Sequence, residues 1–224
     1  MSWESSLLYY QIINERVKER KGGHHSAKSL LYSVDFQEIK DLQHQGNWTE
    51  ATKVMIESAQ KLEAGGADVI VICTNTMHKM ALEVMNSVSI PLLHIADATA
   101  NKIISDKIKN VALLGTAFTM GQEFYKGRLI NQFGLDVIVP DEADRVVIHD
   151  IIYHELCLGI INEHSKKKYL DIIDSLIRKG AEAVILGCTE ITMLISQEDC
   201  SIPIYDTTRL HAEAAVDFAL GDEE

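Results

Sequence analysis

The sequence contains an internal repeat, and this repeat limits the folds that the chain can adopt. Residues 66–76 read GADVIVICTNT and align without a gap on residues 180–190, which read GAEAVILGCTE. The match continues downstream, because residues 89–94 correspond to residues 201–206. Each half carries a short apolar run after a segment of helical period, so the repeat predicts two similar α/β subdomains.

Short β-branched runs alternate with longer helical segments, and this alternation is typical of βαβ units and parallel sheets. Strands are predicted at residues 30–36, 69–73, 92–95, 111–114, 135–139, 184–186 and 202–205. Between them, Asn47 and Glu50 resemble a capping box at the start of one helix, and Lys179-Gly180 is a usual end signal for another. We therefore predict an α/β fold of two αβα subdomains with parallel four-stranded sheets, related by a pseudo-twofold axis. Residues 1–97 plus 207–224 form the first predicted subdomain and residues 98–206 the second.

The two halves differ at their beginnings. The second half has the predicted strand 111–114 before its first loop at Gly115-Thr116, whereas the first half starts directly in the corresponding loop, at Met1-Ser2. We therefore expect the first sheet to lack its N-terminal strand. Either the gene product starts upstream of Met1 or this sheet is one strand short, and we favour a truncated reading frame.

Acidic residues outnumber basic residues by 33 to 21, which gives a net charge of −12. This charge opposes binding to nucleic acid and to anionic membranes, so we expect neither partner. An anionic ligand must then be held by local donors, such as backbone amides at helix N-termini. The N-terminal residues lack the features of a signal peptide, and no apolar run is long enough to span a membrane, so we expect a cytoplasmic protein.

The repeat aligns Thr74 with Cys188, and this pairing carries the functional argument. Ligands of parallel sheets bind at the carboxyl ends of strands, so we expect an active site in the cleft between the subdomains. Inverting a carbon centre requires two proton-transfer groups on opposite faces of that carbon, and a thiol suits this role because its pKa lies near neutrality. Polar groups beside each position, on Asn75, Thr76 and Thr189, would bind a carboxylate and stabilise a carbanion.

The segments Cys73-Thr74-Asn75-Thr76-Met77-His78 and Gly187-Cys188-Thr189-Glu190 resemble the two signature motifs of the aspartate/glutamate racemase family. Met1-Ser2 resembles the loop after the first strand of that family. The resemblance implies a small acidic amino-acid substrate and catalysis by two facing cysteines, without pyridoxal phosphate, metal or other cofactor. It also implies a homodimer.

The chain departs from the family pattern at the first cysteine. The usual motif reads Cys-Asn-Thr, which places Thr74 where the first catalytic cysteine is expected. Cys73 should face away into the sheet packing, because successive strand residues point to opposite faces. A hydroxyl is a poor general base, and in the family the second cysteine deprotonates the L-enantiomer. We therefore expect an asymmetric racemase of L-aspartate and L-glutamate in which Cys188 removes the proton and the Thr74 side returns one.

Further binding residues follow from equivalent positions in the two halves and from the resemblance. Thr116 and Thr119 open the second half where Met1 and Ser2 open the first, and all four are expected to bind substrate. Gln43 stands where the family places a residue that recognises the substrate side chain, which is often arginine in aspartate-specific forms. His78 and Glu190 are candidate supporting residues.

Two other readings stay open. The same thiol cleft would serve another acid with an activated carbon, such as a hydantoin, a malonate derivative or maleate. A non-catalytic amino-acid-binding homologue is the third possibility, in which Thr74 is only a β-branched strand terminus. We do not expect a metal site, because His149 and His154 are five residues apart on a predicted helix and face different directions.

Overall fold

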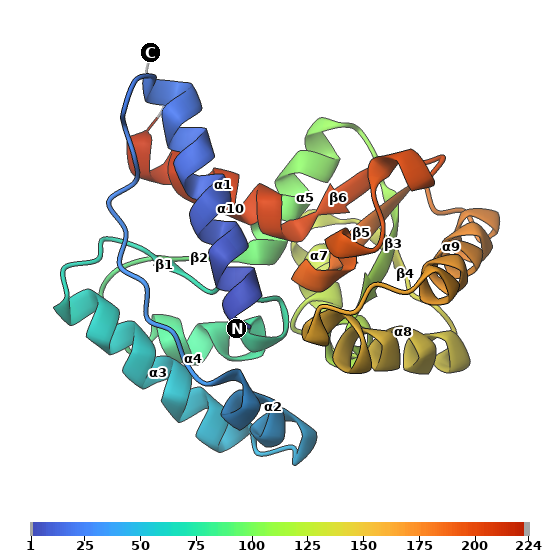
Figure 1. Cartoon of the computed structure of the whole chain (residues 1–224), viewed down its shortest axis with the longest axis horizontal. Helices are drawn as coiled ribbons and strands as arrows, with labels where there is room; N and C mark the ends of the chain where they lie inside the picture. The colour runs from blue at the N-terminus through green and yellow to red at the C-terminus, as the bar shows by residue number, and fades with distance from the viewer. Residues whose placement is uncertain (1, 222–224) are drawn as a thin grey trace. The chain divides into compact units, whose positions relative to one another are not determined.

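The computed structural model describes residues 2–221, and the chain divides into two compact units (Figure 1). The first unit comprises Met1–His94 with His211–Glu224, and the second comprises Ile95–Leu210. The chain passes from one unit to the other at His94–Ile95 and again inside the last helix, between Leu210 and His211. The family-like α/β architecture with parallel sheets is confirmed in both units.

The second unit is built on a four-stranded parallel sheet in the order β4-β3-β5-β6. Its strands are β3 (Asn110–Gly115), β4 (Asp136–Ile138), β5 (Ala183–Gly187) and β6 (Ile204–Asp206). All five residues of β5, and five of the six in β3, are buried. Such continuous apolar runs are typical of parallel strands that are covered on both faces.

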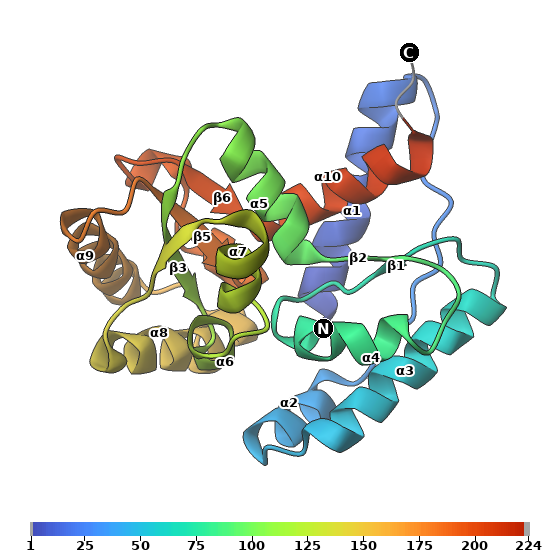
Figure 2. The ribbon, with the colours of Figure 1, turned by 180° about the vertical axis from the view of Figure 1, so that it is seen from behind.

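Helices cover both faces of this sheet. Ile95, Ala100 and Leu129 pack against Val111 and Ile185 on one face. Helices α8 and α9 also contact β3, and the two opposite views place them on the other side of the sheet from α5 and α7 (Figure 2). The helical elements of this unit are α5 (Ile95–Ser105), α6 (Ala117–Gly121), α7 (Lys126–Phe133), α8 (Glu142–His154), η2 (Leu156–Leu158), α9 (Glu163–Arg178), η3 (Thr189–Met193), η4 (Gln197–Asp199) and the start of α10 (Thr207–Leu220).

The first unit contains a two-stranded parallel sheet, with Ile70 paired to Leu92 and Val71 to Leu93. Its elements are α1 (Trp3–Lys21), α2 (Phe36–His44), α3 (Trp48–Ala64), β1 (Ile70–Val71), η1 (Thr76–Met80), α4 (Ala81–Met85), β2 (Leu92–Leu93) and the rest of α10. Helix α3 begins as predicted, because the Asn47 side chain accepts a hydrogen bond from the Glu50 amide at 3.3 Å. Such a cap satisfies one of the N–H groups left free at a helix start.

The predicted strand at residues 30–36 is wrong. Residues 24–35 form no regular element, Leu30 and Leu31 are exposed, and Phe36 already begins α2. In the second unit β3 lies between β4 and β5, whereas no strand of residues 2–221 takes the corresponding place beside β1. An extended segment forms a strand only where another strand offers the ladder hydrogen bonds, so the apolar pattern alone was insufficient here. The other six predicted strands are confirmed within two residues at each end.

Helices α1 and α10 pack together within the first unit. Tyr9, Ile12 and Ala212 form a buried cluster, against which Val71 and Cys73 also pack. Arg20 pairs with Asp217 at 2.9 Å at the edge of this contact. No helix in the part of the chain that the structure describes combines the length and apolar character needed to cross a membrane.

Candidate functional site

The first motif occupies the turn after β1 and the short helix η1 that follows it. Thr74 is half-buried, while Asn75, Thr76 and His78 are buried. The Thr74 amide donates to the Ile72 carbonyl at 2.7 Å. The Thr74 carbonyl lies 2.8 Å from Nδ1 of His78. Both ends of the Thr74 backbone are thus hydrogen-bonded within the first unit.

Cys73 lies beside the motif but turns toward the packing of α1 and α10. Its Sγ atom lies 3.7 Å from the Val71 carbonyl oxygen. Burial raises the pKa of the Cys73 thiol to about 11. At neutral pH this thiol is therefore protonated, and it has the character of a small apolar side chain.

The other predicted residues of the first unit lie close to the motif or at the start of α1. Gln43 is 4% exposed in the last turn of α2, and its Nε2 atom donates to Sδ of Met77 at 3.1 Å. Through this contact α2 packs against the first motif. Ser2 is the N-cap of α1, and its hydroxyl accepts from the Ser5 amide at 3.1 Å. Met1 falls outside the described residues.

The second motif begins where β5 ends, with Cys188 as the N-cap residue of η3. The Cys188 thiol donates to Oε2 of Glu190 at 2.9 Å. Burial raises the pKa of Cys188 well above its usual value, and the negative charge of Glu190 raises it further. The sulfur consequently carries its proton at neutral pH, with a carboxylate placed to accept it.

A pair of glycines brings the strand ends together next to Cys188. Gly115 of β3 pairs with Gly187 of β5. A Cβ atom at Gly187 would lie 2.8 Å from the Leu114 carbonyl oxygen, and one at Gly115 would lie 2.9 Å from the Gly187 carbonyl oxygen. Neither position has room for a side chain, so the sequence Gly-Cys at 187–188 meets a steric requirement of the sheet.

Thr116 and Thr119 lie in the same region of the second unit. Thr116 is the N-cap of α6, and its hydroxyl accepts from the Thr119 amide at 3.3 Å. The methyl group of Thr119 lies 3.2 Å from the position that a Cβ at Gly187 would occupy. The structure therefore places both threonines beside the Gly187-Cys188 turn, where Thr189 and Glu190 are also buried.

Sequence reasoning overlooked several groups around the motifs. In the first unit these are His94 and His211, whose rings lie against that of His78, and Tyr9, whose ring lies against that of His211. In the second unit Tyr153 is buried, and its pKa is raised by burial and then by Cys188. His94 ends the downstream part of the repeat, and this was the one sequence signal that pointed to any of them.

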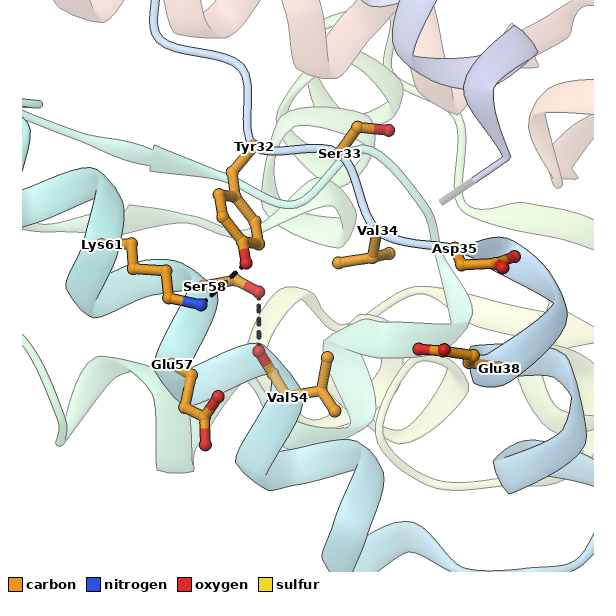
Figure 3. Close-up of a pocket in the computed structure, with 9 residues that line it drawn as sticks. All are labelled: Tyr32, Ser33, Val34, Asp35, Glu38, Val54, Glu57, Ser58 and Lys61. Atoms are coloured by element: carbon orange, nitrogen blue, oxygen red, sulfur yellow. Dashed lines mark hydrogen bonds between the residues drawn. The ribbon is translucent and has the colours of Figure 1, made fainter.

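Among the described residues, no cluster of three or more histidine, cysteine or acidic side chains is arranged to hold a metal ion. A pocket of about 320 Å³ in the first unit opens beside the segment that precedes α2, and Figure 3 shows Lys61 bonded to the Tyr32 hydroxyl at its wall. It is lined by Tyr32, Ser33, Val34, Asp35, Glu38, Val54, Glu57, Ser58 and Lys61. None of the predicted site residues belongs to this lining, so the pocket is separate from the motifs.

Comparisons with known proteins agree with the motifs. A family model described as Asp/Glu/Hydantoin racemase matches residues 1–215. The structure of a Yersinia pestis protein assigned to the Asp/Glu racemases is 51% identical, with a TM-score of 0.92 over 99% of this chain and 96% of that chain. An aspartate racemase homologue from Pyrococcus horikoshii is 32% identical, with a TM-score of 0.81 over 97% of this chain and 95% of that one.

A curated relative gives the same result. The broad specificity amino-acid racemase RacX of Bacillus subtilis is 28% identical over 171 residues, which cover 75% of this chain and 71% of RacX. The family model spans nearly the whole chain, and the strand ends that carry the two motifs are present in both units. The chain therefore belongs to the Asp/Glu/Hydantoin racemase family and is an isomerase.

Proposed function

We propose that this protein racemises the acidic amino acids L-aspartate and L-glutamate, with Cys188 and Thr74 as its two proton-transfer groups. The observation that carries the proposal is the hydrogen bond from the Cys188 thiol to the Glu190 carboxylate, at the end of a buried strand. Family membership supports the reaction, and the aspartate racemase homologue from Pyrococcus horikoshii supports the substrate class.

Proton abstraction is assigned to Cys188 acting with Glu190. A buried thiol with a raised pKa is not itself a base, so its proton must first move 2.9 Å to the Glu190 carboxylate. The resulting thiolate then takes the Cα proton of the L-substrate, which regenerates the thiol and leaves the carbanion electron pair delocalised into the substrate carboxylate. Glu190, now protonated, returns its proton to solvent.

Reprotonation is assigned to the Thr74 side. The half-buried hydroxyl of Thr74 passes a proton from a water molecule to Cα, because a threonine alkoxide is too basic to persist. The same property makes Thr74 a poor acceptor for the proton of a D-substrate. Exchange of the Cα proton with solvent should therefore have a higher initial rate from the L-enantiomer than from the D-enantiomer.

Substrate carboxylates need local donors because the chain carries a net charge of −12. Neutral hydroxyl and amide groups around both motifs supply such donors without adding further charge. We assign this role to Ser2, Gln43, Asn75, Thr76, Thr116, Thr119 and Thr189. Gln43 holds a distal carboxylate less strongly than an arginine fork would, so the relative rates for aspartate and glutamate should differ modestly.

Solvent exchange tests the reaction directly. The protein is incubated with L- or D-aspartate and L- or D-glutamate in D2O, and loss of the Cα proton signal is followed by NMR. We expect exchange from the L-enantiomers at a much higher initial rate than from the D-enantiomers. Measurable substrate binding without any exchange would instead favour the non-catalytic homologue, and equal rates from both enantiomers would contradict the asymmetric mechanism.

Three substitutions separate the assigned roles. Cys188→Ala should abolish exchange, and Glu190→Gln should lower kcat by roughly 10²-fold or more, since general acid–base groups contribute on that scale. Thr74→Cys should raise exchange from the D-enantiomers because it supplies a second thiol. Cys73→Ala serves as the neighbouring control and should retain activity. If Cys73→Ala abolishes activity while Thr74→Cys changes nothing, the assignment of the first proton-transfer position is off by one residue.

A further inference from the structure

Four buried aromatic side chains form a cluster at the first motif, and one of them, His78, is the last residue of that motif. We refer to Tyr9, His78, His94 and His211 as the histidine cluster. The three histidines are 2%, 8% and 0% exposed, respectively. The ring of His78 lies 4.6 Å from that of His94 and 5.6 Å from that of His211, measured between centroids. All four residues belong to the first unit.

Hydrogen bonding fixes the tautomer of His211. Its Nε2 atom lies 2.9 Å from the Leu93 carbonyl oxygen, which only accepts, so Nε2 carries the proton. Its Nδ1 atom is then an acceptor, and it lies 2.8 Å from the Tyr9 hydroxyl, which donates to it. This chain of bonds ties α1 to the end of β2 through the His211 imidazole.

The same argument fixes His78. Its Nδ1 atom lies 2.8 Å from the Thr74 carbonyl oxygen, so Nδ1 carries the proton and donates it. Burial, followed by the neighbouring His94, lowers the pKa of His78 to about 3. His78 therefore remains a neutral donor across the physiological pH range.

The backbone around Thr74 is held by side chains from two directions. The Ser5 hydroxyl of α1 donates to the Cys73 carbonyl at 2.8 Å, and His78 donates to the next carbonyl, that of Thr74. The equivalent residue of the second motif bonds to a different carbonyl: the repeat places Thr192 opposite His78, and the Thr192 hydroxyl donates to the Thr189 carbonyl at 2.8 Å. In the first motif, side chains of α1 and η1 thus bond to two successive carbonyls, those of Cys73 and Thr74.

We propose that His78, backed by Tyr9, His94 and His211, is a positioning residue that fixes the Thr74 backbone and thereby aims its hydroxyl. This inference rests on the proposed role of Thr74 in proton transfer. A hydroxyl that relays a proton tolerates less displacement than a thiolate, because it must align with both water and Cα in one step. A misplacement of about 1 Å can lower a rate by as much as 10²-fold.

A matched pair of substitutions tests the hydrogen bond apart from packing. Both His78→Leu and His78→Asn remove the ring, but asparagine retains an N–H donor close to the position of Nδ1. We expect His78→Leu to lower kcat for L-aspartate by about 10- to 100-fold with KM changed less than about threefold. We expect His78→Asn to restore kcat to within about threefold of wild type. Equal losses in the two variants, or no loss in either, would overturn the proposal.

A second readout does not depend on activity. Nitrogen-15 NMR of the wild-type imidazoles should show His78 protonated at Nδ1 and His211 at Nε2, with His78 neutral at pH 5. Amide hydrogen exchange at residues 74–76 should be faster in His78→Leu than in wild type, and unchanged in His78→Asn. A proton found on Nε2 of His78, or exchange at residues 74–76 that is the same in all three proteins, would refute the positioning role even if His78→Leu proved inactive.

These readouts also separate the inference from the proposed function. If the wild-type protein exchanges no Cα proton, the racemase proposal fails, and with it the catalytic meaning of the positioning, whereas the amide exchange still reports whether His78 holds the turn.

Tyr9→Phe removes the donor to His211 and should lower kcat by a few fold. Tyr10→Phe, on an exposed neighbour in the same helix, is its control and should leave kcat unchanged. Equal kcat values in these two variants would show that Tyr9 does not help to hold His78 in place.

Discussion

Replacing Gly187 by alanine tests whether the close approach of β3 and β5 positions Cys188. The added Cβ would lie 2.8 Å from the Leu114 carbonyl oxygen and 3.2 Å from both Leu113 Cδ1 and the Thr119 methyl carbon. The nearest atom belongs to the backbone of β3, which is paired with β5 along its length and cannot rotate away. The two strands must therefore separate locally, next to the Cys188 sulfur.

The expected loss in the free energy of unfolding follows from the packing of the sheet. Inserting a methyl group into a closely packed core costs typically about 1–3 kcal/mol. For a unit of this size that corresponds to a fall in the unfolding midpoint of roughly 3–12 °C. Displacement of the Cys188 turn should lower kcat at the same time, because the sulfur, Glu190 and Thr119 all share this corner of the sheet.

Thermal and urea unfolding, followed by the Cα exchange assay, measure both effects. Gly121→Ala is the matched control, since the nearest atom to its Cβ would be Nη1 of Arg145 at an ordinary 3.7 Å. We expect the control to alter the free energy of unfolding by less than about 0.5 kcal/mol. If Gly187→Ala is as stable and as active as Gly121→Ala, the strand ends are not sterically coupled to the site, and the reasoning is refuted.

Acidification should destabilise the protein through His78, whose folded pKa of about 3 lies below the ordinary 6.5. The unfolded chain binds a proton that folded His78 does not, so this contribution is fully favourable above about pH 6.5 and is lost as pH falls toward 3, by roughly 2 kcal/mol between pH 7 and pH 5. Urea titrations at both pH values should show this loss in wild type and a smaller one in His78→Leu; identical pH dependence in the two proteins would contradict it. Thr116→Ala should cost about 0.5–2 kcal/mol by removing the cap of α6, and Thr116→Ser should restore the stability. Unfolding midpoints provide that comparison, and an equal loss in the serine variant would exclude capping as the cause.

Particular elements show which structural features a sequence pattern predicts and which it does not. The continuous apolar runs of β3 and β5 and the cap at Asn47 were predictable because each depends on residues close in the chain. Residues 30–36 have the same composition as a strand, yet they form none, because pairing depends on a second segment whose presence no local pattern reports. Gln43 was expected near the site, but its bond to Met77 depends on how α2 packs.

The repeat by itself determined that there are two α/β halves and that Thr74 and Cys188 occupy equivalent strand ends. The reason is that a gapless alignment assigns each residue of one half to the same structural position as its counterpart in the other half. Tertiary structure alone decided which groups touch these positions. The Ser5 hydroxyl reaches the Cys73 carbonyl across 68 residues of chain, and Tyr9 reaches His211 across 202 residues. Such contacts arise from packing between distant segments, so their partners are set by the three-dimensional fold and not by spacing along the chain.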